Sequence, residues 1–167
     1  MIVRVEQQQD RPFVRAVNAS AFKNMAEADL VDALRQKAHP VVSLVAEAAG
    51  EIVGHIMLSP VSLDGRPELR IMGLAPMAVA PGHQRKGIGT VLVRAGLAHC
   101  GQLSVGAVVV LGHPAYYSRF GFLPAARFGV SSEYEAPEEA FMLLEVQSGY
   151  LAGVTGVIRY HEAFKDV

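Results

Sequence analysis

One short stretch of the chain combines glycines with positive charge where an apolar run of strand type meets an apolar run of helix type. It reads Val79-Ala80-Pro81-Gly82-His83-Gln84-Arg85-Lys86-Gly87-Ile88-Gly89-Thr90. The first N–H groups of a helix have no intrahelical partners and the helix dipole is positive there, so an anion is favoured at this end. Glycine also lacks the Cβ atom that keeps a ligand away from the main chain. The stretch therefore predicts a site for a phosphate-bearing ligand.

Two common phosphate-binding motifs do not describe this stretch. Gly82 and Gly87 have the spacing of the two glycines in a Walker A motif, but Ile88-Gly89 stands where Lys and Ser or Thr are required. A dinucleotide fingerprint needs a third glycine, which the residues after Gly89 do not supply. A glycine-rich turn with two solvated basic residues is the simpler alternative to a ligand site.

The segment from Gln84 to Gly89, preceded by Met77 to Pro81, resembles the acetyl-coenzyme A signature Gln/Arg-x-x-Gly-x-Gly/Ala of the GCN5-related N-acetyltransferase (GNAT) superfamily. The resemblance implies that the pyrophosphate of acetyl-coenzyme A binds at this loop. It also implies that the strand before the loop leaves its parallel neighbour, so that its free main-chain groups pair with the pantetheine arm. The cofactor-binding residues that follow from the resemblance are Met77, Ala78, Val79, Gln84, Arg85, Lys86, Gly87, Ile88, Gly89 and Thr90.

A second stretch, Gly112 to Phe122, carries an independent resemblance to the same superfamily. Pro114 is placed to open a short helix and Gly121 to end it. Tyr117 to Phe122 has the pattern Tyr-x-x-x-Gly-Phe, which in GNAT enzymes lies close to the cofactor sulfur. The resemblance implies that Tyr117 is the general acid that protonates the departing thiolate, since a neutral phenol can donate a hydrogen bond at neutral pH. Tyr116 is expected to pack on the sheet.

The base that takes a proton from the accepting amine is less clearly marked. An alkyl ammonium cannot attack a thioester, so the amine needs a base or a chain of water molecules. Many superfamily members place a glutamate on the strand before the loop Gln84–Thr90, called the phosphate loop here. In this chain Ile71 to Pro76 has no carboxylate. His113, after a buried strand and next to the Tyr117 helix, is the best-placed candidate. His55 and His161 are expected to be hydrogen-bonded structural residues within strands.

Hydrophobic periodicity places these residues on a mixed framework of helices and strands. Pro76 predicts a bulge in a central strand, because proline cannot donate to a strand ladder. The resemblance implies a GNAT-like α/β (α+β) fold, with a mostly antiparallel sheet, one parallel strand pair and helices on both faces. The expected strands are Ile2–Glu6, Val41–Ala48, Glu51–Pro60, Leu69–Val79, Ala107–Leu111, Ala140–Val146 and Gly156–Glu162. Three helices are expected: one capped by Asp10, one that begins at Glu27 and one that begins at Gly87.

Composition limits the classes of protein. The 167 residues, 51% hydrophobic and 19% charged, suit one packed domain spanning 1–167. A net charge of -1 argues against a nucleic-acid binder. Cys100 is the single cysteine, which excludes an internal disulfide and a Cys-based metal cluster, and it is expected to be a buried apolar residue. No run suits a membrane span or a secretory signal, and we expect a cytoplasmic protein that binds no metal.

The resemblance implies an N-acetyltransferase that moves the acetyl group of acetyl-coenzyme A directly to an amine, borne by an unidentified small molecule or peptide, and suggests a homodimer. It also implies that Ala19 to Ala26 closes over the acceptor, although these residues suit a solvated turn equally well. The acidic segment Glu133 to Glu139 hints at a cationic acceptor, with a solvated loop as the favoured alternative. The missing strand glutamate keeps open a non-catalytic acyl-coenzyme A sensor or interaction module on the same fold.

Overall fold

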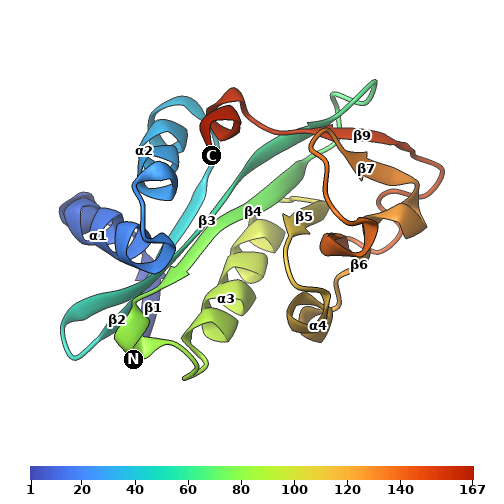
Figure 1. The fold of residues 1–167 in the computed structure, drawn as a ribbon. Coiled ribbons are helices and arrows are strands. Elements are labelled where there is room, and N and C mark those ends of the chain that lie inside the picture. The colour runs from blue at the N-terminus through green and yellow to red at the C-terminus, as the bar shows by residue number, and fades with distance from the viewer.

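A nine-stranded sheet forms the centre of the molecule in the computed structural model, which describes all residues from Met1 to Val167 (Figure 1). The strands are β1 (Ile2–Val5), β2 (Val42–Ala48), β3 (Glu51–Leu63), β4 (Ile71–Val79), β5 (Ala107–Leu111), β6 (Leu123–Pro124), β7 (Val130–Ser132), β8 (Phe141–Glu145) and β9 (Gly156–Arg159). The α-helices are α1 (Arg11–Phe22), α2 (Ala26–Lys37), α3 (Ile88–Gln102) and α4 (Pro114–Tyr117). None of the helices is both long and apolar enough to cross a membrane.

The strand order confirms the expected mixed topology. The main path runs β1-β2-β3-β4-β5-β8-β6, and β9 joins the far end of β3 and also pairs with β7. The expected meander of β2, β3 and β4 is antiparallel, and β4 and β5 form the expected parallel pair. β7 and β9 are parallel as well, which the sequence did not indicate because each strand is only three or four residues long.

Helices cover both faces of the sheet, as expected (Figure 1). On one face, Leu92 and Val93 of α3 lie in a core of residues from β2 to β5. On the other face, Leu34 of α2 and Val14 of α1 pack with Val45 of the sheet. The C-terminal 3-10 turn, Glu162–Asp166, lies beside α2, where Phe164 packs against the same core.

β4 and β5 separate soon after they pair. Their ladder holds only at Ile71–Gly73, opposite Ala107–Val109. From Leu74 onward the edge of β4 that faces β5 has no strand partner. The register with β3 also shifts, because Ala75-Pro76 stand opposite the single residue Met57. The predicted bulge at Pro76 is therefore confirmed, and it lies where the two parallel strands part.

Two local expectations were wrong. Asp10 precedes α1, but its carboxylate accepts from the Gln7 amide at 2.7 Å and pairs with Arg4 at 2.7 Å, so it does not cap that helix. The last strand ends at Arg159, and His161 lies beyond it, with its Nδ1 accepting from the Ala163 amide at 3.1 Å. The Asp10 carboxylate is thus occupied by Gln7 and Arg4, and His161 caps the C-terminal 3-10 turn.

A chain of hydrogen bonds through buried His55 runs along the face of the sheet that carries α1 and α2, as expected of a structural histidine. The Asn18 side-chain amide donates to His55 Nδ1 at 3.1 Å, so Nε2 carries the proton and donates to Ser43 Oγ at 2.9 Å. Ser43 in turn donates to the Glu6 carboxylate at 3.2 Å, and Arg35 pairs with Glu6 at 2.7 Å. Burial, with the charge of Arg35, lowers the pKa of His55 to about 3.

This histidine should make the protein less stable in mild acid. A histidine in the unfolded chain has a pKa of about 6.5. Below that pH the unfolded chain binds a proton at this position, whereas native His55 stays neutral. The free energy of unfolding therefore decreases as the pH falls from about 6.5 towards 3. Between about pH 7 and about pH 5 we expect the free energy of unfolding to fall by about 2 kcal/mol. Urea unfolding at both pH values measures it. The substitution His55→Gln should remove this part of the pH dependence, and an unchanged slope in that variant would contradict the assignment.

Candidate active site

The loop after β4 presents free main-chain amides, as the sequence predicted. Gly87 precedes α3 with φ 83°, a left-handed conformation that favours glycine. The first intrahelical bond runs from the Val91 amide to the Gly87 carbonyl at 3.2 Å. The amides of Ile88, Gly89 and Thr90 therefore have no backbone partner and lie at the positive end of a fifteen-residue helix.

A cavity of about 490 Å³ lies over these amides and is called the loop cavity here. Most of the predicted binding residues line it, but two do not. Lys86 is exposed and lies outside its wall, and Ala78 faces the opposite side of β4 from Met77 and Val79, as strand alternation requires. The predicted residues in the wall are Met77, Val79, Gln84, Arg85, Gly87, Ile88, Gly89 and Thr90.

Gln84 holds the shape of the loop. Its side-chain amide donates to the carbonyl of Val79 at 3.0 Å, and the neighbouring Ala80 amide donates to the Val53 carbonyl at 2.8 Å. These two bonds tie the loop to the ends of β4 and β3. The side chain of Gln84 thus positions the amides at the start of α3 in addition to lining the cavity.

The sequence analysis did not predict two residues of the loop cavity, Tyr116 of the short helix α4 and Arg119 of the 3-10 turn Ser118–Phe120 that follows it. The Tyr116 hydroxyl lies 3.4 Å from Thr90 Oγ1, and a Cβ at Gly89 would lie only 3.0 Å from it. The guanidinium of Arg119 lies 5.0 Å from the centre of the Tyr116 ring. Tyr116 packs against the core of the sheet, as expected, and it also lines the loop cavity, which was not predicted. The sequence did contain a signal for this pair: Tyr116 and Arg119 are three residues apart, which places their side chains on the same side of a helical turn.

A second cavity of about 580 Å³ lies between α1, α2 and the separated ends of β4 and β5, and is called the β-gap cavity here. Tyr117 lies in its wall, and so does Glu27 of α2. Met77 lines both this cavity and the loop cavity, so the two meet at the point where β4 has left β5. Apart from Ser132, the remaining wall residues are apolar or aromatic: Phe22, Leu30, Leu74, Ala75, Pro76, Leu111, Tyr134, Tyr160, Phe164 and Val167.

Tyr117 is held as a neutral phenol. Its ring centre lies 5.7 Å from that of Phe122 and 5.1 Å from that of Tyr116, and only 9% of the residue is exposed. Burial, together with Tyr116, raises the pKa of Tyr117 to about 12. The side chain therefore keeps its proton over the physiological pH range and can donate it to a group that enters the β-gap cavity.

His113 and Cys100 lie away from these two cavities. His113 is exposed just before α4, and its side chain lines neither cavity; its carbonyl accepts from the Tyr116 and Tyr117 amides at 3.1 Å. A catalytic role for His113 stays a prediction. Cys100 is buried against Met72, and burial raises the pKa of its thiol to about 12, as suits an apolar structural residue.

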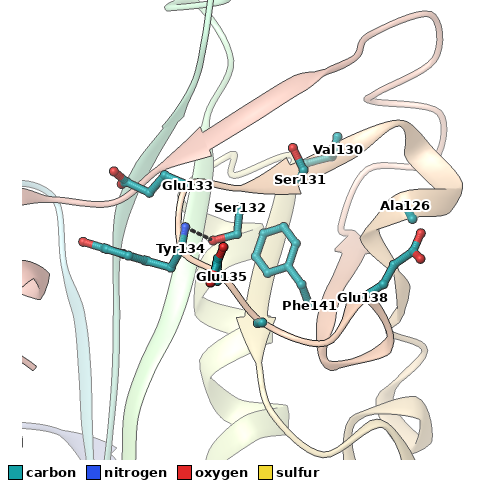
Figure 2. Close-up of a pocket in the computed structure, with 10 residues that line it drawn as sticks. Ala126, Val130, Ser131, Ser132, Glu133, Tyr134, Glu135, Glu138 and Phe141 are labelled. Atoms are coloured by element: carbon teal, nitrogen blue, oxygen red, sulfur yellow. Dashed lines mark hydrogen bonds between the residues drawn. The ribbon is translucent and has the colours of Figure 1, made fainter.

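A third cavity, of about 680 Å³, lies beside the acidic segment before β8 (Figure 2). Glu133, Glu135, Glu138 and Phe141 line it, but the Glu133 carboxylate points away from the Phe141 ring and accepts from the Tyr160 amide at 2.6 Å. None of the predicted site residues lines this cavity. It shares Ser132 and Tyr134 with the β-gap cavity, so the acidic segment adjoins the wall opposite the phosphate loop.

Comparison with known proteins assigns this arrangement to a family. The model of the acetyltransferase (GNAT) family matches residues 4–122, which include both the phosphate loop and the Tyr117–Phe122 segment. The chain belongs to the GNAT family. It is 38% identical over 165 residues to the uncharacterized N-acetyltransferase YhbS of Escherichia coli strain K12, with 98% of both chains covered.

Solved structures of GNAT proteins agree with the fold. The crystal structure of YhbS from Escherichia coli in complex with CoA matches with a TM-score of 0.92 and 36% identity, over 98% of this chain and 91% of that one. A GNAT acetyltransferase from Brucella melitensis in complex with acetyl-CoA matches with a TM-score of 0.80 and 37% identity, over 98% and 97%. The GNAT fold predicted from the sequence is confirmed.

Proposed function

We propose that this protein is an N-acetyltransferase that transfers the acetyl group of acetyl-coenzyme A directly to an amine. The observation that carries the proposal is the gap between β4 and β5, where Met77 joins a cavity suited to an anion with a cavity that holds a phenol donor. A pantetheine arm laid along the free edge of β4 would bring a thioester from the first cavity to the second. Similar proteins crystallised with CoA and acetyl-CoA support this arrangement.

The residues of the loop cavity fit a diphosphate. Three unpaired amides and the guanidinium groups of Arg85 and Arg119 supply donors and positive charge, and Gly87 and Gly89 leave room for close approach. No carboxylate lines this cavity. We assign Met77, Val79 and the Gln84–Thr90 loop to cofactor binding, with Ala78 contributing main chain only and Lys86 acting from outside the cavity.

Tyr117 is the proposed general acid. The thiolate that leaves the thioester needs a proton, since a free thiol has a pKa near ~8.5 and its anion is costly in an apolar cavity. Tyr117 is protonated and lines the cavity in which the thioester carbon is expected to lie. The phenol gives its proton to sulfur as the C–S bond breaks.

Binding and turnover test this proposal separately. Titration calorimetry should show saturable binding of acetyl-coenzyme A, and release of free coenzyme A in the presence of a panel of amines should show turnover. Absence of binding at millimolar concentration by folded protein would remove the proposal. Binding without coenzyme A release above the rate of hydrolysis for any amine would favour the non-catalytic sensor.

Arg119 offers a test of the loop cavity outside the sequence motif. We expect Arg119→Ala to weaken acetyl-coenzyme A binding about tenfold, because a charge-assisted contact to phosphate is lost. Arg94→Ala is the matched control, since Arg94 also lies over an aromatic ring, Phe120 at 5.3 Å, but does not line the cavity. Calorimetry of both variants measures the effect. Equal affinities in the two variants would contradict the placement of Arg119.

Four further properties stay predictions. The single domain 1–167 is supported by a sheet whose strands come from residues 2 to 159. The cytoplasmic location rests on the sequence alone. A homodimer and an acceptor of small-molecule or peptide type rest on the family resemblance, and light scattering of the purified protein would test the first.

A further inference from the structure

The two joined cavities carry opposite charge. The loop cavity is lined by Arg85 and Arg119 and by no carboxylate. The β-gap cavity is lined by the carboxylate side chain of Glu27 and by no lysine or arginine. An anionic ligand and a cationic ligand are therefore each favoured on a different side of the gap between β4 and β5. This separation bears on the acceptor, whose chemistry the phosphate loop does not specify.

Glu27 has an oxygen that the protein leaves without a partner. Its Oε2 is shielded from solvent and accepts no hydrogen bond, and the carboxylate takes part in none of the ion pairs of the molecule. Removing an ionised carboxylate from water without a partner is costly. Glu27 lies in the first turn of α2, where the helix dipole stabilises its negative charge but supplies no donor at Oε2. A ligand cation would supply the missing partner.

The wall beside Glu27 is aromatic. The ring centres of Tyr134 and Tyr160 lie 5.6 Å apart, and those of Tyr160 and Phe164 lie 5.1 Å apart. Burial raises the pKa of both tyrosines, so both rings remain neutral phenols. The Tyr134 hydroxyl is also buried without a partner. Aromatic faces attract a desolvated cation and also accept the apolar body that carries it.

We infer that the acceptor is a primary amine that enters as an ammonium ion, with an aromatic or aliphatic body and no carboxylate, and that Glu27 binds the ammonium and takes its proton. The inference rests on the proposed acetyl transfer and adds to it the acceptor class and the base. A free amino acid fits poorly, because its carboxylate would meet Glu27 in a cavity without a compensating cation. Glu27 thereby fills the role of the carboxylate that the Ile71–Pro76 segment lacks.

The proton balance of this reaction involves two side chains. Glu27 removes one proton from the ammonium, and the free amine attacks the thioester carbon. A C–N bond forms, the C–S bond breaks, and sulfur takes the proton of Tyr117. The nitrogen then loses its second proton, which restores the Tyr117 phenol, while Glu27 releases the first proton to solvent. The net products are the acetamide, free coenzyme A and one proton.

The test uses two probes that differ by one group. 2-Phenylethylamine has the ammonium and the apolar body, and L-phenylalanine adds a carboxylate to the same skeleton. We expect the wild-type protein to acetylate 2-phenylethylamine with a kcat/KM about 100-fold above that for L-phenylalanine, because like charges meet only with the second probe. Coenzyme A release measures turnover, and calorimetry with coenzyme A present measures amine binding.

The variant Glu27→Gln should lower kcat/KM for 2-phenylethylamine about 100-fold, since it removes the charge-assisted contact and the base together. Glu135→Gln is the matched control, because Glu135 is an exposed glutamate that lines only the neighbouring acidic cavity. Both variants should bind acetyl-coenzyme A as the wild-type protein does, which also shows that they are folded. If Glu27→Gln fails to bind acetyl-coenzyme A while Glu135→Gln binds it, the test uses Glu27→Asp instead. That variant keeps the negative charge and should retain most of the affinity for 2-phenylethylamine.

The outcomes separate this inference from the proposed function. Failure of wild-type protein to bind acetyl-coenzyme A removes the proposed function itself. Normal cofactor binding with equal use of the two probes, or equal activity of Glu27→Gln and wild type, overturns the inference and leaves the proposed function standing. Failure of 2-phenylethylamine to bind at millimolar concentration overturns the acceptor class.

Discussion

Tyr117→Phe should lower kcat about 100-fold or more while leaving the affinity for acetyl-coenzyme A nearly unchanged. A positioned acid contributes roughly 10²- to 10⁴-fold to a reaction in which a proton must reach the leaving group. The variant removes only the hydroxyl and keeps the ring that packs against Phe122 and Tyr116, so the fold and the loop cavity should survive. Stopped-flow or steady-state release of coenzyme A measures kcat, and calorimetry measures cofactor affinity.

Tyr150→Phe is the matched control for Tyr117. The Tyr150 hydroxyl accepts from the Arg70 amide at 2.7 Å and lines neither the loop cavity nor the β-gap cavity, so kcat should stay at the wild-type value. Because burial holds the pKa of Tyr117 at about 12, the acid stays protonated, and no loss of kcat from its ionisation should be seen below that range. Equal kcat in Tyr117→Phe and wild type would retire Tyr117 as the acid.

Gly87→Glu should reduce the affinity for acetyl-coenzyme A at least about 100-fold. The substitution places a negative charge beside the amides assigned to the diphosphate, where like charges repel. It also forces a residue with a Cβ into φ 83°, which is unfavourable even though no atom lies within 4 Å of the added Cβ. Titration calorimetry measures the loss.

Two further variants separate charge from backbone strain. Gly82→Glu adds the same charge to the same exposed loop, outside the cavity wall and without a positive φ, and should bind nearly as well as wild type. Gly87→Ala carries the strain without the charge and should lose only a small part of the affinity. If Gly82→Glu and Gly87→Glu bind equally well, the diphosphate does not lie over the start of α3.

The sequence was informative wherever local chemistry decides the outcome. The phosphate loop was predicted because glycine freedom and the unpaired amides of a helix start depend on a few adjacent residues, here Gly87 to Thr90. The bulge at Pro76 was predicted for the same reason, since a proline cannot donate to any strand. The buried strand Ala107–Leu111 was predicted with its observed bounds, because a continuous apolar run has one favourable place in a mixed sheet.

Residues brought together from distant parts of the chain were beyond such reasoning. Tyr116 and Tyr117 are adjacent in sequence but line different cavities. Tyr116 lines the loop cavity and Tyr117 lines the β-gap cavity, because α4 lies between these two cavities. Glu27 is an ordinary first-turn glutamate in the sequence, where it indicates only a favourable helix start. Glu27 shares a cavity with Tyr134 and Tyr160, and its oxygen is buried without a partner, only because α2 and the C-terminal segments fold around that cavity.

The sequence by itself determined the family, the framework and the loop of free amides before α3, because these depend on periodicity and on short motifs. Only the tertiary structure decided which charged side chains line the loop cavity and the β-gap cavity. Burial and hydrogen bonding of a side chain depend on the elements packed around it. The Glu27 carboxylate would be solvated on an isolated helix, and it lacks a hydrogen-bond partner only where other elements exclude water.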